Sequence, residues 1–413
     1  MRDSSGSSRE RSERLAGALL ILPPGAGEPD SVSPATHIAG LPLLRRIVLA
    51  AMEAGFGQVL LHPAAAPDDR SLLRGTTATL LAPPTGLLPP LPPRRIVLLA
   101  TNVLPTAQWL RSLLEMPTEP EWLYTDGSSA AVIETGDPAL VLAEAARCNG
   151  ARELWAFLSK AFTTGDRPLG GEGRFPLTPA AVRHAEDWLL RGLVREAEGF
   201  MSRHVERRIS LALTRRLAAT RITPNAMTLV SLGVGLLGAP FFLSPAPAYQ
   251  LTGALLLLAH SILDGCDGEL ARLKFQESRL GSLLDFWGDN VVHVGVMACI
   301  AIGWSLAGHT AWPLLIGGVA AGSVLLAAAF VYRRTRQEKA LAGRLFPSGS
   351  RRRARWLPRL VDMLARRDFI YLVVLLAAAG KATWFLALAA VGTPVFVLLL
   401  AWIDRTERRR VPS

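Results

Sequence analysis

The stretch DGCDGELAR at residues 264–272 is followed, after eight further residues, by GSLLDFWGD at residues 281–289. The two stretches lie between long apolar runs and carry four aspartates, which are Asp264, Asp267, Asp285 and Asp289. The first pair is spaced i,i+3 and the second i,i+4, so each pair lies on one face of a helix. Ionised aspartates beside membrane segments are costly and usually functional. Two helices that each offer a carboxylate pair predict a pocket of oxygen ligands, which suits Mg²⁺ or Mn²⁺.

The spacing of these residues, D-x2-D-G-x2-A-R-x8-G-x3-D-x3-D, resembles the signature of the CDP-alcohol phosphotransferases. These are integral membrane enzymes of phospholipid and polyol-phosphate synthesis. The resemblance covers about residues 180–405, and every specified position of the signature is present. It implies an enzyme that transfers a phosphoalcohol group from a CDP-alcohol to an acceptor hydroxyl and releases CMP.

The same resemblance implies roles for individual residues. The four aspartates would hold the metal, expected to be two Mg²⁺ or Mn²⁺ ions, and Asp285 and Asp289 would be catalytic, with Asp289 as the general base. Arg272 would pair with a phosphate or hold an aspartate, and the two roles cannot be separated from sequence. Residues 223–228, TPNAMT, match the family's start of the first span. The residues expected to contact CDP are Asn225, Thr228, Gly268, Ala271, Arg272 and Gly281.

Long runs without Asp, Glu, Lys or Arg predict membrane spans. These runs cover residues 226–263, 290–332 and 382–403. A spanning helix needs about 20 apolar residues, so each of the first two runs can hold about two passes. We therefore expect an α-helical integral membrane protein with six transmembrane helices, near residues 226–243, 248–272, 281–304, 311–332, 367–383 and 385–403. Lys381 interrupts the last pair, which makes those two helices short.

The distribution of charge predicts the orientation. Segment 333–367 holds twelve Lys and Arg against two acids, whereas the loops at 244–249 and 305–310 hold no Lys or Arg. By the positive-inside rule, the aspartate motif and both termini are cytoplasmic in a multi-pass inner (plasma) membrane protein. Residues 1–14 do not resemble a signal peptide. Because the positive charge lies beside the predicted spans, we expect it to face a lipid bilayer, and we expect no nucleic acid partner.

The region before the spans reads as a soluble α/β domain. Apolar strand-like runs at 16–22, 58–61 and 96–100 alternate with helical stretches at 43–54 and 138–148. Segment 178–221 mixes aromatic and aliphatic residues with arginines, which predicts one or two amphipathic helices at the membrane interface. The domains expected are a disordered tail at 1–15, the α/β domain at 16–175, the amphipathic segment at 178–221, the membrane domain at 222–405 and a basic tail at 406–413.

Residues 37–55 of the α/β domain resemble a sugar-nucleotide type of nucleotidyltransferase, in which a G-x-P-L turn opens a helix. The bifunctional relatives that carry such a domain make CDP-inositol from inositol phosphate and CTP. Here the loop at 23–30, PPGAGEPD, lacks the basic residues that would hold a triphosphate, and Asn102 stands at the metal-binding turn. Asn is a poor substitute for a carboxylate ligand of Mg²⁺. We therefore expect the domain to be catalytically silent, serving for docking or stabilisation.

Other polar residues receive plainer interpretations. We expect His260 and His293 to be packed or hydrogen-bonded core residues rather than ligands, Glu269 and Glu277 to be solvated loop or interface charges, and Cys266 to fill a helix face rather than act as a nucleophile. The arginines at 351–353 are expected to face lipid headgroups. Arg366 and Arg367 precede the fifth span, where relatives hold a phosphorylated acceptor, so they are the predicted acceptor site.

Three functions remain open on this evidence. One is the phosphotransferase with an anionic or hydroxyl acceptor and a donor such as CDP-diacylglycerol, and the resemblance implies a homodimer. The second uses a soluble CDP-polyol such as CDP-inositol and a polyol phosphate, as in di-inositol-phosphate-phosphate synthases. The third is a transporter whose aspartates carry cations, although the carboxylates gather at one membrane boundary.

Overall fold

The computed structural model describes residues 17–25, 32–66, 70–81, 95–193, 206–342 and 369–408. The chain forms two compact units, Met1–Gly192 and Leu193–Ser413, and each has its own core. The predicted disordered tail, the acceptor arginines and the arginines at 351–353 all lie outside the described residues.

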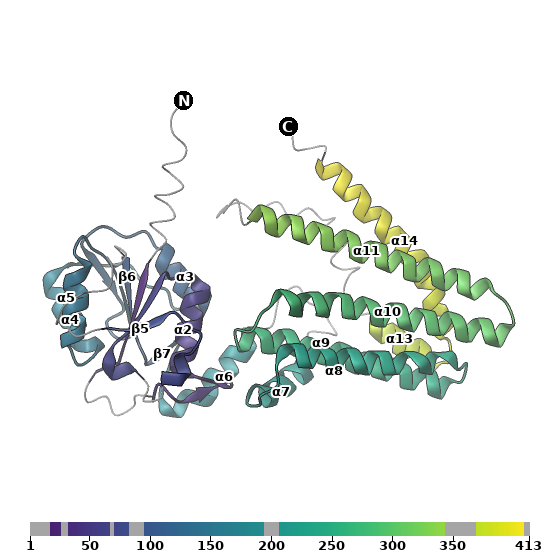
Figure 1. The fold of residues 1–413 in the computed structure, drawn as a ribbon, viewed down its shortest axis with the longest axis horizontal. Coiled ribbons are helices and arrows are strands. Elements are labelled where there is room, and N and C mark those ends of the chain that lie inside the picture. Colours follow the sequence, from purple (N-terminus) through teal and green to yellow (C-terminus); the bar gives the residue numbers. More distant parts are fainter. Residues whose placement is uncertain are drawn as a thin grey trace. The chain divides into compact units, whose positions relative to one another are not determined.

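The first unit is a sheet covered by helices on both faces (Figure 1). Its seven strands have the order β10-β8-β9-β6-β1-β4-β5. β1 pairs in parallel with β4 and β6, whereas β9 runs antiparallel to its neighbours β6 and β8. The strands are β1 (Ala18–Leu22), β4 (Gln58–Leu61), β5 (Ala78–Leu80), β6 (Arg95–Ala100), β8 (Trp122–Thr125), β9 (Ala130–Glu134) and β10 (Thr163–Gly165).

The helices of this unit pack on the apolar faces of the sheet. β1 is buried along its whole length, as expected for a central strand of a mostly parallel sheet. The helices are α2 (Leu43–Ala54), α3 (Ala107–Glu115), α4 (Pro138–Arg147), α5 (Ala151–Ala161) and α6 (Val182–Arg191). Two small ribbons complete the unit, and they pair β2 (His37–Ile38) with β3 (Leu41–Pro42) and β7 (Val103–Pro105) with β11 (Arg174–Pro176). The strands and helices predicted at 16–22, 58–61, 96–100, 43–54 and 138–148 are confirmed as β1, β4, β6, α2 and α4.

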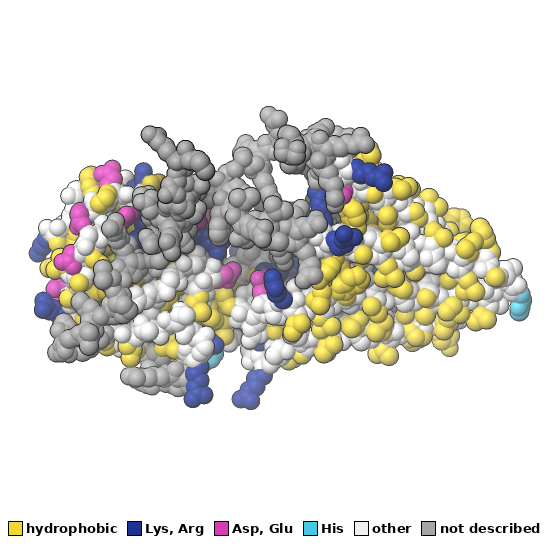
Figure 2. Space-filling model, turned by 45° about the horizontal axis from the view of Figure 1, so that its top comes forward, with side chains coloured by type: hydrophobic (Ala, Val, Ile, Leu, Met, Phe, Trp, Pro, Cys, Tyr) yellow, Lys and Arg dark blue, Asp and Glu magenta, His cyan; other side chains and the backbone are white. Residues whose placement is uncertain are grey.

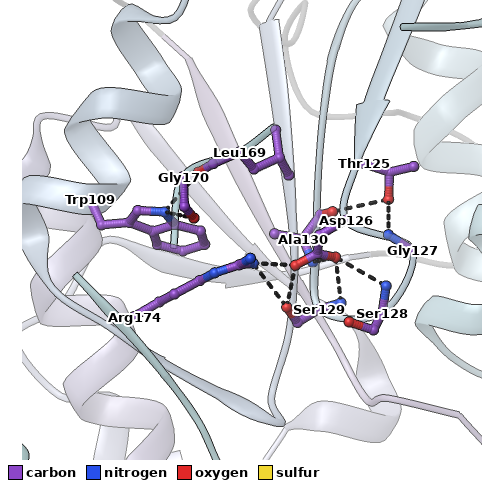
Figure 3. A network of polar contacts seen from close by, with 10 residues as sticks. All are labelled: Trp109, Thr125, Asp126, Gly127, Ser128, Ser129, Ala130, Leu169, Gly170 and Arg174. Carbon is purple, nitrogen blue, oxygen red and sulfur yellow. Dashed lines mark hydrogen bonds and ion pairs between the residues drawn. The ribbon is translucent and has the colours of Figure 1, made fainter. Parts of the chain in front are cut away.

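A polar network joins the second ribbon to the turn between β8 and β9 (Figure 3). Asp126 accepts hydrogen bonds from the backbone N–H groups of residues 128–130, and Arg174 of β11 pairs with its carboxylate. The guanidinium of Arg174 also lies over the ring of Trp109 in α3, 5.3 Å from its centroid. Desolvation alone would raise the pKa of Asp126, but the hydrogen bonds from Ser129 and the backbone outweigh it and lower the pKa to about 2.

The predicted amphipathic segment 178–221 is divided between the two units. α6 belongs to the first unit, where Glu186 accepts a hydrogen bond from the N–H of Ala39 and Trp188 packs against Phe175. α7 (Arg207–Ala218) belongs to the second unit. The location at a membrane interface stays a prediction for α7.

The second unit is a bundle of long helices. After α7 come α8 (Pro224–Gly238), the 3₁₀ helix η5 (Ala239–Leu243), α9 (Pro247–Leu273), α10 (Arg279–Gly308), α11 (Trp312–Ala342), α13 (Phe369–Ala378) and α14 (Ala382–Arg408). α8 begins as the sequence predicts, because the Thr223 hydroxyl accepts from the N–H of Ala226 and Pro224 occupies the first turn. α8 and α9 approach closely, since a Cβ on Gly253 would lie 2.9 Å from the carbonyl oxygen of Gly238.

Four of the described helical segments are long and apolar enough to cross a membrane, and they cover Pro224–Leu243, Arg279–Gly308, Trp312–Arg334 and Ala382–Trp402. The predicted number of six is not confirmed. α9 is long enough, but its buried Gln250, His260 and aspartates make it more polar than these four. α13 has 10 described residues, about 15 Å of helix against a hydrocarbon core of about 30 Å.

The surface of the second unit is apolar. Figure 2 shows hydrophobic side chains covering most of the described surface over its helices. Leu237 and Leu398 are each 69% exposed and Leu326 is 63% exposed. Exposed apolar surface of this extent fits contact with lipid. Lys381, which interrupts the last pair of predicted spans, lies at the turn between α13 and α14 and sits 5.4 Å from the ring centroid of Trp384.

Candidate metal and nucleotide site

Three of the four motif aspartates meet between α9 and α10. One carboxylate oxygen from each of Asp264, Asp267 and Asp285 lies within 4.8 Å of the other two. Asp264 and Asp267 are 4% and 6% exposed, and Asp285 is partly buried. They come from adjoining antiparallel helices joined by a short turn, in which Phe275 adopts a positive φ of 55°.

This group of carboxylates fits a divalent cation. Three carboxylates that are largely removed from water and close together repel one another, and a bound cation relieves that repulsion. All three ligand atoms are oxygens, the preferred ligands of Mg²⁺ and Mn²⁺. The residues brought together by the fold are therefore suited to the metal that the motif predicts.

Asp289 lies one turn further along α10 and is not a member of that group. Its Oδ1 atom lies 3.4 Å from Nε2 of His260 on α9. The other ring nitrogen of His260, Nδ1, lies 2.9 Å from the carbonyl oxygen of Ser231 and must donate to it. His260 is 3% exposed, so the prediction of a hydrogen-bonded core residue is confirmed, but the contact with Asp289 connects it to the site.

Residues at the start of α8 and α10 support the carboxylates. The buried hydroxyl of Thr228 donates a short hydrogen bond to Oδ2 of Asp267. Gly281 allows close approach to α8, because a Cβ there would lie 2.7 Å from Oδ1 of Asn225. Both residues predicted to contact CDP from α8 therefore lie beside the motif helices.

The remaining predicted CDP contacts follow Asp267 along α9. A Cβ on Gly268 would lie 3.4 Å from Nη1 of Arg272, so this guanidinium lies over the glycine. Ala271 and Arg272 are partly buried on the last turn of the helix. The absence of a side chain at Gly268 leaves room beside Arg272, as expected where a phosphate approaches a guanidinium.

The prediction that Glu269 is a solvated loop or interface charge is wrong. Glu269 is 0% exposed, and its carboxylate pairs with Arg207 and accepts hydrogen bonds from the hydroxyls of Ser210 (2.7 Å) and Thr214 (2.6 Å). α9 continues past the aspartates to Leu273, so Glu269 faces α7 rather than a solvated loop. The spacing of Arg207, Ser210 and Thr214, which places them on one face of a helix, was the sequence signal for this contact.

Cys266 behaves as the sequence predicts. It is buried, and its sulfur lies 3.5 Å from the carbonyl oxygen of Ser210 and 3.4 Å from that of Ile262. It points toward α7 and not toward the aspartate group, which fits the filling of a helix face.

In the first unit, the described part of the loop after β1 packs on α5. The N–H groups of Ala151 and Arg152 donate to the carbonyl oxygens of Pro23 (2.8 Å) and Pro24 (3.2 Å). A Cβ on Gly150 would lie 2.7 Å from the Cα of Gly25. The N–H groups at the start of a helix commonly bind phosphate, and here the chain itself occupies two of them.

Comparisons with known proteins agree with this site. Residues 221–395 match the family model described as CDP-alcohol phosphatidyltransferase. A bifunctional IPC transferase and DIPP synthase from Rubrobacter xylanophilus is 34% identical over 223 residues, covering 52% of this chain and 45% of that protein. A CDP-diacylglycerol–serine O-phosphatidyltransferase from Mycobacterium leprae is 29% identical over 192 residues, covering 45% and 59%.

The chain spans less than half the length of the bifunctional relatives that it matches. A solved structure of Mycobacterium tuberculosis phosphatidylinositol phosphate synthase with CDP-DAG bound is 21% identical, covering 47% of this chain and 94% of that chain, with a TM-score of 0.32. The match to the family model includes all four motif aspartates and confirms the resemblance seen in the sequence. Residues 221–395 of this chain thus match the CDP-alcohol phosphatidyltransferase family.

Proposed function

We propose that this chain is a metal-dependent CDP-alcohol phosphotransferase that acts at the inner (plasma) membrane. The observation that carries the proposal is the meeting of Asp264, Asp267 and Asp285 within 4.8 Å, inside the segment that matches the family. An oxygen-lined group of this kind suits the binding of a pyrophosphate through divalent cations.

The proposed reaction moves one phosphoalcohol group. The oxygen of the acceptor hydroxyl bonds to the β-phosphorus of the CDP-alcohol, the bond from that phosphorus to the bridging oxygen breaks, and CMP leaves with the bond electrons. The hydroxyl proton passes to a carboxylate of the chain. Divalent ions held by Asp264, Asp267 and Asp285 would neutralise the negative charge of the phosphates.

Asp289 is the proposed proton acceptor. It lies outside the three-carboxylate group, one turn after Asp285 on α10, and its contact with His260 orients the side chain. It also remains a proposed ligand of a second ion, as the family signature implies. A base must lie within hydrogen-bond reach of the proton that it takes.

The donor is proposed to lie against α8 and the motif helices. Asn225 and Thr228 offer an amide and a hydroxyl, and Arg272 offers a guanidinium to phosphate. Gly268 and Gly281 have no side chains, and the lack of one at Gly281 lets Asn225 lie against α10. The acceptor is proposed to be an anion or a hydroxyl compound held by Arg366 and Arg367, and the enzyme is proposed to be a homodimer with a cytoplasmic site.

A second candidate keeps the mechanism and changes the substrates. The similarity to bifunctional IPC transferase and DIPP synthases, together with the α/β unit before the membrane domain, favours CDP-inositol as donor and a polyol phosphate as acceptor. The α/β unit itself is proposed to be catalytically silent. A cation transporter is disfavoured, because these carboxylates gather at one end of their helices and not along a path.

The test is release of CMP by purified full-length protein in detergent with Mn²⁺ and a panel of CDP-alcohols, each offered with polyol phosphates, amino alcohols and serine. We expect CMP release with at least one pair, its loss with EDTA, its return with added Mg²⁺ or Mn²⁺, and none from the matched variant Asp285→Asn. CMP release that does not respond to chelator, or that equals the rate of the Asp285→Asn variant, would exclude the proposal.

A further inference from the structure

A fully buried carboxylate lies two residues after the proposed metal ligand Asp267 and has no part in the mechanism above. Glu269 points away from the aspartate group and into α7, where Arg207, Ser210 and Thr214 all bond to it. The three partners lie on one face of α7 at spacings of three and four residues. A buried carboxylate needs such partners, because each hydrogen bond that is lost leaves part of its buried charge uncompensated.

The contact between α7 and α9 extends over the last three turns of α9. The Cys266 sulfur lies 3.5 Å from the carbonyl oxygen of Ser210, and Gly265 faces the side chains of α7, since a Cβ there would lie 3.7 Å from Nη1 of Arg207. Beyond the end of the helix, Nζ of Lys274 donates to the carbonyl oxygens of Thr220 (2.9 Å) and Ile222 (3.1 Å). Both the start of α7 and the residues after its end are therefore bonded to α9.

These contacts lie on the opposite side of α9 from the metal group. Asp264 and Asp267 face Asp285 and Thr228, whereas Gly265, Cys266 and Glu269 face α7. The polar contact at Glu269 is directional, so it opposes rotation of α9 about its own axis. Apolar packing alone would resist such a rotation less, because it has no preferred angle.

We propose that Glu269 is a positioning residue: by bonding α9 to α7 it sets the rotation of α9 and so the separation of Asp264 and Asp267 from Asp285. The inference rests on the proposed function, since it concerns the proposed metal ligands. A carboxylate oxygen lies about 5 Å from the helix axis, so a rotation of roughly 12° moves it by about 1 Å. Metal sites tolerate deviations of only about 0.2 Å in ligand distance. A small rotation is therefore enough to weaken metal binding without unfolding the helix.

The experiment measures the Kd of Mn²⁺ alone by electron paramagnetic resonance, with full-length protein in detergent, together with the Tm of each variant. In Glu269→Gln, Arg207 keeps its charge but loses the carboxylate. In Thr214→Val, one hydrogen bond is lost at constant volume. The matched control is Gln250→Met, which removes a buried polar anchor at the other end of α9, where Oε1 accepts from the N–H of Ala382 (3.1 Å).

We expect Glu269→Gln to weaken Mn²⁺ binding by roughly 10–100-fold, the range seen when residues that orient metal ligands are changed. Thr214→Val should weaken it less, and Gln250→Met should lower the Tm while keeping the Kd of wild type. The single variant Arg207→Met and the double variant Arg207→Met/Glu269→Gln complete the comparison. The fold-change in the Mn²⁺ Kd of the double variant should be smaller than the product of the two single fold-changes, because both residues act through one contact.

The proposal is overturned if Glu269→Gln lowers the Tm as Gln250→Met does and binds Mn²⁺ as wild type does. If Glu269→Gln does not fold, Thr214→Val is the test: a weaker Mn²⁺ Kd supports the proposal, and a wild-type Kd overturns it. Failure of the wild-type protein to bind Mn²⁺ would instead reject the metal site of the proposed function, so the two failures are distinguishable.

Discussion

Nε2 of His260 and Oδ1 of Asp289 lie 3.4 Å apart and connect α9 to α10 beside the carboxylate group. His260 is held from its other side by the carbonyl oxygen of Ser231 on α8, so three helices meet at this ring. The pair explains how Asp289 can stay outside the group formed by Asp264, Asp267 and Asp285 while it lies on the same helix as Asp285.

Replacing Asp289 with Asn should abolish CMP release and leave Mn²⁺ binding largely in place, because Asp264, Asp267 and Asp285 are unchanged. Removal of a general base commonly costs about 10²–10⁴-fold in rate. The measurement is the initial rate of CMP release, with the Mn²⁺ Kd of the same preparation as control. A variant that keeps more than half of the wild-type rate would show that another group accepts the proton.

Replacing His260 with Phe should lower kcat with little change in the KM for the CDP-alcohol. The ring volume is kept, but the side chain that orients Asp289 loses its polar atoms, and loss of an orienting partner commonly costs about 10-fold or more. The matched control is His293→Phe, one turn beyond Asp289 on α10, where the ring contacts Phe369 at 5.4 Å between centroids. Equal kcat values for the two variants would contradict a role for His260 in orientation.

Changing Arg366 and Arg367 together to Ala should raise the KM for the acceptor before it alters the KM for the CDP-alcohol. Each guanidinium can grip a phosphate with two hydrogen bonds, which the alanines cannot do. The control is the triple change of Arg351, Arg352 and Arg353 to Ala, which should act mainly through membrane charge and ionic strength. Equal effects of the two sets on both substrates would mean that no discrete acceptor site exists at 366–367.

The full-length protein should release no pyrophosphate from CTP in the presence of sugar or polyol phosphates. Pro23 and Pro24 occupy N–H groups at the start of α5, and Asn102 stands where a metal-binding carboxylate is expected. The assay is pyrophosphate release, with the Asp289→Asn variant included so that the membrane domain cannot contribute. Pyrophosphate above background in that variant would make the chain bifunctional.

The first unit should lose stability as pH falls from about 4 to about 2. The pKa of Asp126 is lowered to about 2 in the folded unit from an ordinary value of 3.8. A lowered pKa stabilises the fold above the unfolded-state value, and this contribution disappears as pH falls through the folded-state value. The contribution should be about 2 kcal/mol at neutral pH. The Tm difference between wild type and Asp126→Asn should therefore shrink between pH 5 and pH 2, and a constant difference would contradict this account.

The helical boundaries were predictable because they depend on local sequence. For most ends of α8, α9, α10 and α11, the runs without charge predicted the boundary to within a few residues. Pro224 indicated the start of α8. The C-terminal end of α11 was missed, because the helix continues through Arg333 and Arg334 to Ala342, where helical propensity and not hydropathy decides. The number of membrane passes was less predictable, because α9 combines buried polar residues with a spanning length and the described part of α13 has only 10 residues.

The sequence by itself determined that four aspartates lie in two pairs on two helices, because their spacing sets which helix face each pair occupies. Only the tertiary structure decided which of them meet. The rotation of α9 against α10 brings Asp264, Asp267 and Asp285 together and turns Asp289 toward His260. The same rotation buries Glu269 against α7, some 55 to 62 residues away in the chain. Such contacts depend on how helices that are far apart in the sequence pack against each other. The residue pattern within one helix does not specify which helix packs against its other face.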